Sequence, residues 1–156
     1  MSKMNLSIDI DAAPEAVFDM IADIENSAAR IEGIEKIEML TEGPVGVGTK
    51  WRETRLMMKK EAVEEMEITA FERPTHYTVY CDSCGCDMNW TMSVQPRGDG
   101  STLTLDMTSK ARTLMGKLMT PLGWLMSGMM KKCVVKDLEN IKAYIEKVGA
   151  PTPAGD

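Results

Sequence analysis

The most conspicuous group of reactive side chains is the segment 81–86, which reads CDSCGC. A Cys-x-x-Cys spacing is typical of zinc sites and of thiol exchange. A structural zinc site takes about four ligands, and the usual second pair is missing, because Cys133 lies far along the chain and His76 is the single histidine. We therefore predict no metal and no cofactor. Cys81, Cys84 and Cys86 are interpreted as reduced surface thiols or as an incidental disulfide, with Cys81 and Cys86 facing each other across a hairpin.

A second candidate group lies in a strand predicted at 49–58. Trp51, Glu53 and Arg55 share one face of it, because side chains alternate along a strand. If Trp51 points into the core, the two charged residues follow it, and buried charges must pair with each other or hold a polar group. The alternative is that both lie solvated near the rim. Together with Tyr77, they are the groups that can transfer a proton or polarise a substrate inside an apolar chamber.

Other functional classes lack their motifs or their charge. The sequence has no G-x-S-x-G elbow, P-loop or G-x-G-x-x-G, and Gly46-Val47-Gly48 precedes a strand rather than a helix. The formal charge of −6 opposes binding to nucleic acid. No secretory signal is recognisable, and no apolar run approaches the ~20 residues of a membrane span. We therefore expect a cytoplasmic protein without stable membrane insertion.

The periodicity of the apolar residues predicts an α+β fold. A strand at 4–10 precedes two short helices, the first from Pro14 to Ile24 and the second from Asn26 to Ile31. Six antiparallel strands and one long C-terminal helix follow. They are expected at 34–41, 49–58, 61–71, 76–82, 87–96 and 101–109, with the helix at 121–148. The chain is predicted to be one domain, 1–149, with a disordered tail at 150–156.

Several segments, in this order, resemble the START-like or SRPBCC superfamily. They are the segment Ile10–Glu25, the run from Gly46 to Trp51, the turn Phe71-Glu72-Arg73-Pro74, and Trp90–Pro96 followed by Gly98–Thr102. The superfamily includes polyketide cyclase/dehydrase-like and lipid-transport proteins. The resemblance implies a helix-grip fold, in which a seven-stranded curved antiparallel sheet wraps around the C-terminal helix, with two short helices between strands 1 and 2.

A curved sheet with a helix across it easily leaves a cavity between the two. Given the resemblance, we expect the inward side chains of the strands and of the last helix to line this space. The predicted ligand-binding residues are Trp51, Glu53, Arg55, Met66, Ile68, Tyr77, Val79, Trp90, Met92, Leu105, Met107, Leu122, Met126, Met129 and Met130. The 15 methionines suit an interior that adapts to its contents, and a solid core is the alternative.

The favoured hypothesis is binding, for sequestration or transport, of a small hydrophobic or lipid-like ligand by a monomer or homodimer. The less favoured hypothesis is a polyketide cyclase/dehydrase-like enzyme that uses Glu53, Arg55 and Tyr77. A third hypothesis is a protein-interaction module built on the apolar stretch Leu118–Met130. The same stretch is otherwise interpreted as a gate to the cavity, a dimer contact, a transient membrane contact or buried core.

Overall fold

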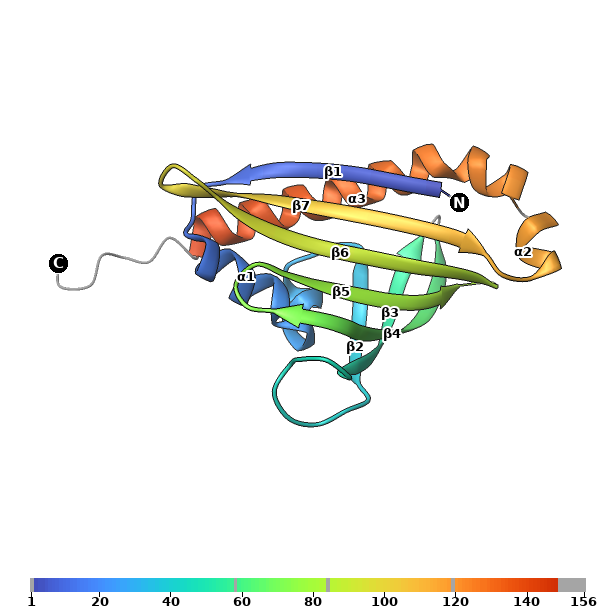
Figure 1. Cartoon of the computed structure of the whole chain (residues 1–156), viewed down its shortest axis with the longest axis horizontal. Coiled ribbons are helices and arrows are strands. Elements are labelled where there is room, and N and C mark those ends of the chain that lie inside the picture. The colour runs from blue at the N-terminus through green and yellow to red at the C-terminus, as the bar shows by residue number, and fades with distance from the viewer. Residues whose placement is uncertain (1, 58, 84, 119, 149–156) are drawn as a thin grey trace, which may run out of the picture.

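The computed structural model describes residues 2–57, 59–83, 85–118 and 120–148 and shows a curved sheet grasping one long helix (Figure 1). The element order matches the prediction, apart from one additional short helix. The strands are β1 Ser2–Ile10, β2 Ile34–Met39, β3 Lys50–Met57, β4 Lys60–Glu72, β5 His76–Ser83, β6 Cys86–Arg97 and β7 Gly100–Ala111. The helices are α1 Pro14–Ala22, the 3-10 helix η1 Ile24–Ala29, α2 Leu114–Leu118 and α3 Thr120–Val148.

The seven strands form one antiparallel sheet in the order β1-β7-β6-β5-β4-β3-β2. From β2 to β7 each strand pairs with the next in the chain, and β1 returns to pair with β7, with Leu6 opposite Leu105. The turn between β5 and β6 contains Gly85 with a φ of 78°, a left-handed conformation that favours glycine. The predicted fold is confirmed, and the strand ends differ from the prediction by one or two residues.

The short helices differ more from the prediction. Helix α1 ends at Ala22, and the second helix is a 3-10 helix at Ile24–Ala29 rather than a helix extending to Ile31. Helix α2 was not predicted, because five residues that include Gly116 are too few to show a helical period. The tail predicted at 150–156 lies outside the described residues.

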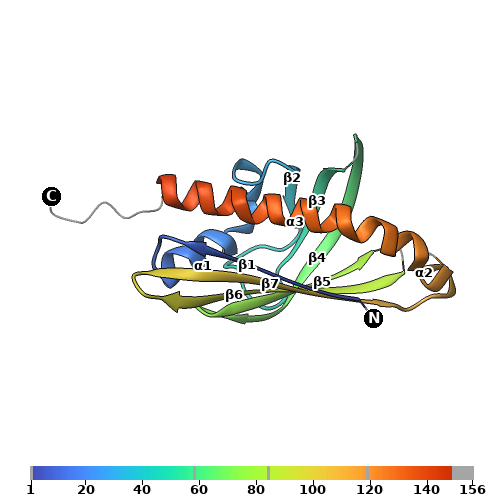
Figure 2. The ribbon, with the colours of Figure 1, turned by 90° about the horizontal axis from the view of Figure 1, so that it is seen from above.

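Helix α3 lies across the concave side of the sheet, as Figure 2 shows from above. Its apolar stripe faces the strands, and Val134, Leu138, Ile141 and Ile145 are buried. Helices α1 and α2 lie at opposite ends of the sheet (Figure 1). Within the described residues, no helix is long and apolar enough to span a bilayer.

An aromatic cluster fixes α1 against the sheet. Phe18 is fully buried and meets Phe71 of β4 edge to face, with 5.3 Å between ring centroids. It meets Tyr77 of β5 in the same way at 6.0 Å. Such edge-to-face contacts add to the free energy gained from burying the rings. These ring contacts therefore hold α1 closely against β4 and β5.

Candidate functional site: a cavity between the sheet and helix α3

A cavity of about 230 Å³ lies between the sheet and α3. Its walls come from β2 to β7, from α1 and η1, and from the inward stripe of α3. An apolar cavity of about 150 Å³ is known to hold benzene, so this one has room for a larger body than a single ring. The sheet and helix do not close completely on each other.

Most of the predicted ligand-binding residues line this cavity. They are Trp51, Glu53, Arg55, Met66, Tyr77, Val79, Trp90, Met92, Leu105 and Met130. Ile68 and Met107 lie instead in the solid core, where their side chains are 0% and 6% exposed. Met129 is 39% exposed, because it precedes the inward-facing Met130 by one residue and so points away from the sheet. The side chains of Leu122 and Met126 lie outside the described part of the structure.

Other lining residues were not predicted. The segment from α1 to β2 contributes Met20, Ile21, Ile24, Ser27, Arg30, Ile31 and Ile34, while the strands add Glu64, Ser83 and Met88. Helix α3 adds Cys133, Val134, Asp137, Leu138 and Ile141. Asp137 left a signal in the sequence, because it is a charged residue three positions after Val134, on the apolar stripe. Met88 left another, two residues before Trp90 on the same face of β6.

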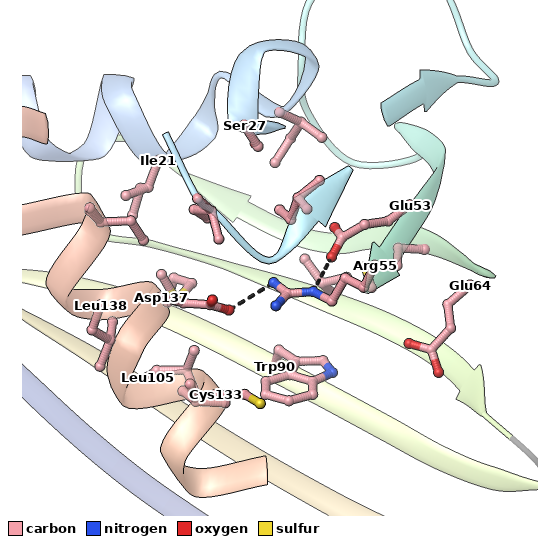
Figure 3. Close-up of a pocket in the computed structure, with 18 of the residues that line it drawn as sticks. Ile21, Ser27, Glu53, Arg55, Glu64, Trp90, Leu105, Cys133, Asp137 and Leu138 are labelled. Carbon is pink, nitrogen blue, oxygen red and sulfur yellow. Dashed lines mark hydrogen bonds and ion pairs between the residues drawn. The ribbon is translucent and has the colours of Figure 1, made fainter. Parts of the chain in front are cut away.

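A network of three charged residues crosses the cavity from β3 to α3. Arg55 Nε donates to Glu53 Oε1 at 2.7 Å, and its Nη2 lies 2.7 Å from Asp137 Oδ2 (Figure 3). The side chains of Arg55, Glu53 and Asp137 are only 24%, 9% and 17% exposed. Trp51 Nε1 also donates to Glu53 Oε2, at 3.4 Å. Glu53 is thus buried, Arg55 is partly buried, and the two are partners, so the alternative of two solvated charges at the rim is wrong.

Burial and the neighbouring charges govern the protonation of this network. Burial raises the pKa of Asp137 above the ordinary aspartate value, although Arg55 acts in the opposite direction. Burial alone would lower the pKa of Arg55, but the bond to Asp137 and the charges of Glu53 and Asp137 outweigh it and raise that pKa. Arg55 therefore stays a fixed cation, held in one orientation from both sides.

Tyr77 lies at the α1 end of the cavity, and its hydroxyl proton is already engaged. The hydroxyl donates to the main-chain oxygen of Ile21 at 3.0 Å. Burial, and to a smaller extent the charge of Glu53, raises the pKa of this phenol. Of the three predicted catalytic groups, the structure joins Glu53 and Arg55, while it uses the Tyr77 hydroxyl to hold the end of α1.

The cysteine segment lies at the hairpin that joins β5 to β6. Ser83 is opposite Cys86, which places Met88 opposite Cys81, so the expectation that Cys81 and Cys86 face each other is wrong. Cys81, Cys86 and Cys133 are free thiols, and Cys84 lies outside the described residues. No group of three or more metal-ligating side chains occurs in the described part of the chain. Cys81 is 1% exposed, so its interpretation as a surface thiol is wrong. Burial together with the nearby Glu64 raises its pKa to about 12.

Comparison with solved structures finds similar folds over nearly the whole chain. The ZhuI aromatase/cyclase from Streptomyces sp. R1128 has a similar structure, with a TM-score of 0.74 and 16% identity over 94% of each chain. A START superfamily protein from Mycobacterium smegmatis gives 0.72 and 13%, covering 92% of this chain and 98% of that one. The TTHA0849 protein from Thermus thermophilus gives 0.72 and 19%, covering 92% and 97%.

These likenesses show the START-like, helix-grip fold. A comparison with curated protein sequences finds no match. The family model described as polyketide cyclase/dehydrase and lipid transport matches residues 1–146, which include the sheet and nearly all of α3. The chain therefore belongs to the polyketide cyclase/dehydrase and lipid transport family.

Proposed function

We propose that this chain binds a small hydrophobic molecule between the sheet and α3, in order to sequester or transport it. The observation that carries the proposal is the cavity itself, with mainly apolar walls and a few convergent polar groups. Ligand sites in proteins typically have this composition. The family description, which includes lipid transport, supports the same function.

Burial of apolar surface supplies the affinity in this proposal. A ligand that removes roughly 200 Å² of apolar surface from water gains about 5 kcal/mol, before the cost of its immobilisation. Five methionines among the described residues line the cavity, and their unbranched side chains adjust to irregular shapes. They are Met20, Met66, Met88, Met92 and Met130. The lining therefore selects a ligand by its size and hydrophobicity rather than by one exact shape.

The polar network supplies orientation. Arg55 is already fixed by Glu53 and Asp137, so a polar group of the ligand meets an arrangement that needs no rearrangement on binding. Preorganised groups of this kind reduce the free-energy cost of ordering. We expect the ligand to place its polar group toward β3 and β4 and its apolar body toward the methionines.

A pair of variants on α3 tests the proposal. Cys133 lines the cavity, whereas Val135 is 36% exposed on the opposite side of the helix. Cys133→Phe should fill the cavity and weaken binding of a neutral fluorescent dye such as N-phenylnaphthylamine by roughly tenfold or more. Val135→Phe adds the same ring outside and should leave binding unchanged. Equal affinity of all three proteins for the dye would exclude the cavity as the binding site.

The natural ligand can be sought directly. Native mass spectrometry of the protein purified from its source should show a bound small molecule, which the Cys133→Phe variant fails to retain. Fluorescent-dye displacement by the extracted molecule then checks that it occupies the same cavity.

A second candidate is catalysis of a cyclisation or dehydration in the same cavity. Two observations favour it: a buried cation between two carboxylates, and the structural likeness to an aromatase/cyclase. Arg55 would polarise a carbonyl, and Glu53 would accept a proton from the adjacent carbon. Glu53→Gln should then abolish turnover of a polyketone test substrate and leave dye binding intact. Turnover that survives this change excludes Glu53 as the base.

A further inference from the structure

The charges on the cavity wall do not balance. The charged side chains among the described lining are Arg30, Glu53, Arg55, Glu64 and Asp137. Arg30 is already neutralised, because it forms an ion pair with Asp23 and donates to the main-chain oxygen of Met20 at 2.6 Å. Among the described lining residues, Arg55 is therefore the one remaining cation, against three carboxylates. With those carboxylates ionised, the excess is two negative charges.

This excess of negative charge is concentrated where two glutamates lie opposite each other on adjacent strands. Glu53 of β3 and Glu64 of β4 are partners in the strand register, and both line the cavity. Directly opposite residues have Cβ atoms about 5 Å apart, and like charges in such pairs repel. The next pair along the same strands is Arg52 and Glu65 on the outer face, joined by an ion pair of 2.8 Å. The outer pair is complementary and the cavity pair is not.

The described residues leave the Glu53–Glu64 pair incompletely compensated. Glu53 shares its cation, Arg55, with Asp137. Glu64 accepts a hydrogen bond from the hydroxyl of Ser83, which is a neutral donor, and forms no ion pair within the described part of the chain. Figure 3 shows the Glu64 carboxylate apart from the Arg55 network but directed toward the same space.

Neighbouring groups experience this negative field. After burial, Glu64 is the next cause of the raised pKa of the Cys81 thiol. Glu53 contributes, again after burial, to the raised pKa of Tyr77 and of Asp137. Each of these shifts disfavours a further negative charge in or beside the cavity.

We infer that the cavity is selective for hydrophobic molecules with a protonated amine and discriminates against those with a carboxylate. This inference rests on the proposed ligand-binding function: the cavity is the site, and the Glu53–Glu64 pair determines which polar group it accepts. An ammonium group near this pair forms charge-assisted hydrogen bonds and replaces repulsion with attraction. A carboxylate in the same place adds to the repulsion, because the charge of Arg30 is balanced by Asp23 and that of Arg55 by Glu53 and Asp137.

A series of probes with one apolar body and three polar groups tests this selectivity. Naphthylmethylamine, naphthylmethanol and naphthoate are each titrated against the protein with bound N-phenylnaphthylamine at pH 7. We expect dye displacement to show that the amine binds roughly tenfold more tightly than the alcohol, and the alcohol more tightly than the carboxylate. The cavity-filling Cys133→Phe variant should lose this binding, which shows that the amine does not simply adhere to an acidic surface.

Two glutamate variants locate the effect. Glu64→Gln removes a carboxylate from the cavity wall, whereas Glu65→Gln removes one from the outer face of the same strand. Glu64→Gln should reduce the preference for amine over alcohol to about threefold or less, while Glu65→Gln preserves it. The affinity for the alcohol should be the same in the unmodified protein and in Glu65→Gln.

The outcomes separate this inference from the proposed function. If naphthoate binds as tightly as naphthylmethanol, or the amine gains nothing over the alcohol, the selectivity is refuted while the cavity remains a binding site. A preference that survives Glu64→Gln also refutes it, because the negative charge then acts from elsewhere. If the dye and all three probes fail to bind, both this inference and the proposed function are wrong.

Discussion

The two ends of the sheet are built on different principles. At the α1 end, Phe18, Phe71 and Tyr77 pack ring against ring, and the Tyr77 hydroxyl is satisfied by the main chain of α1. At the α2 end, Leu114 and Leu118 are 81% and 76% exposed, and α2 covers little of the sheet (Figure 1). One end excludes water by close packing, and the other leaves large apolar side chains uncovered.

This difference indicates that one part of the core stabilises the fold and another part is available to a ligand. Close packing at the α1 end stabilises the fold, and it continues into β6 and β7, against which α1 lies. The incompletely filled space lies between α3 and the strands, where polar groups and methionines line the wall. Substitutions at the packed end should therefore affect stability, and substitutions around the cavity should affect ligand and pH dependence.

The largest expected effect is the loss of the central ring at the packed end. Phe18 is fully buried and touches both other rings, so Phe18→Ala leaves a cavity that the surrounding rings cannot close. We expect the free energy of unfolding in urea to fall by about 3–5 kcal/mol. Val47→Ala, at a 69% exposed position, is the control and should cost less than about 0.5 kcal/mol. A small loss for Phe18→Ala would show that the α1 end is not the stabilising end.

The next effect concerns the cation that crosses the cavity. Arg55→Met leaves Glu53 and Asp137 buried without their partner, and should cost about 2–3 kcal/mol at pH 7 because the site is mostly but not fully buried. The loss should shrink as the pH falls toward 5, since the raised pKa of Asp137 favours protonation of this carboxylate, which removes an unpaired buried charge. Arg52→Met, which breaks an exposed ion pair on the outer face, should cost less than about 1 kcal/mol.

The Tyr77 hydroxyl tests how far the packed end depends on polar contacts. Tyr77→Phe retains the ring contacts but leaves the main-chain oxygen of Ile21 without its donor, which should cost about 1–2 kcal/mol in urea unfolding. Tyr80→Phe removes a partly exposed hydroxyl that donates to Asp87 at 2.8 Å, and should cost less. Equal losses for the two variants would contradict the role of Tyr77 as an anchor of α1.

Alkaline pH should weaken the fold through a buried thiol. The pKa of Cys81 is raised from 9.0 to about 12, so the unfolded chain loses this proton at a lower pH than the folded chain. Stability is therefore complete below pH 9 and falls as the pH rises toward 12. Between pH 8 and 10 we expect a loss of about 1 kcal/mol that is absent in Cys81→Ala and retained in Cys86→Ala. The same slope in all three proteins would assign the titration to other groups.

Much of the fold could be predicted from the sequence, because alternation and helical spacing are local properties. Because side chains alternate along a strand, an inward Trp51 predicted that Glu53 and Arg55 also point inward, and the structure confirms this. Whether the two charges were buried could not be predicted, since that depends on α3 bringing Asp137 across from 82 residues further along the chain than Arg55. The one indication in the sequence was Asp137, a charged residue on the apolar stripe of the last helix.

The contribution of α1 and η1 to the cavity was beyond sequence reasoning. Met20, Ile24 and Ile31 are apolar at helical spacing, which equally fits a solid core. The direction in which the bent helical pair turns decides whether these side chains meet the sheet or the cavity. That direction depends on long-range contacts such as the one between Phe18 and Phe71 rather than on any local period.

The smallest expected effect lies at the exposed end. Leu114 is 81% exposed, so Leu114→Ser removes little buried surface and should change the free energy of unfolding by less than about 0.5 kcal/mol. Leu103→Ser, at a fully buried position of β7, should cost several kcal/mol because it creates a cavity and buries a hydroxyl. If Leu114→Ser costs more than about 1 kcal/mol, α2 is covered in solution and the two ends are more alike than the structure indicates. A near-zero effect instead shows that Leu114 contributes little to folding, which leaves this apolar end available for contacts with other molecules.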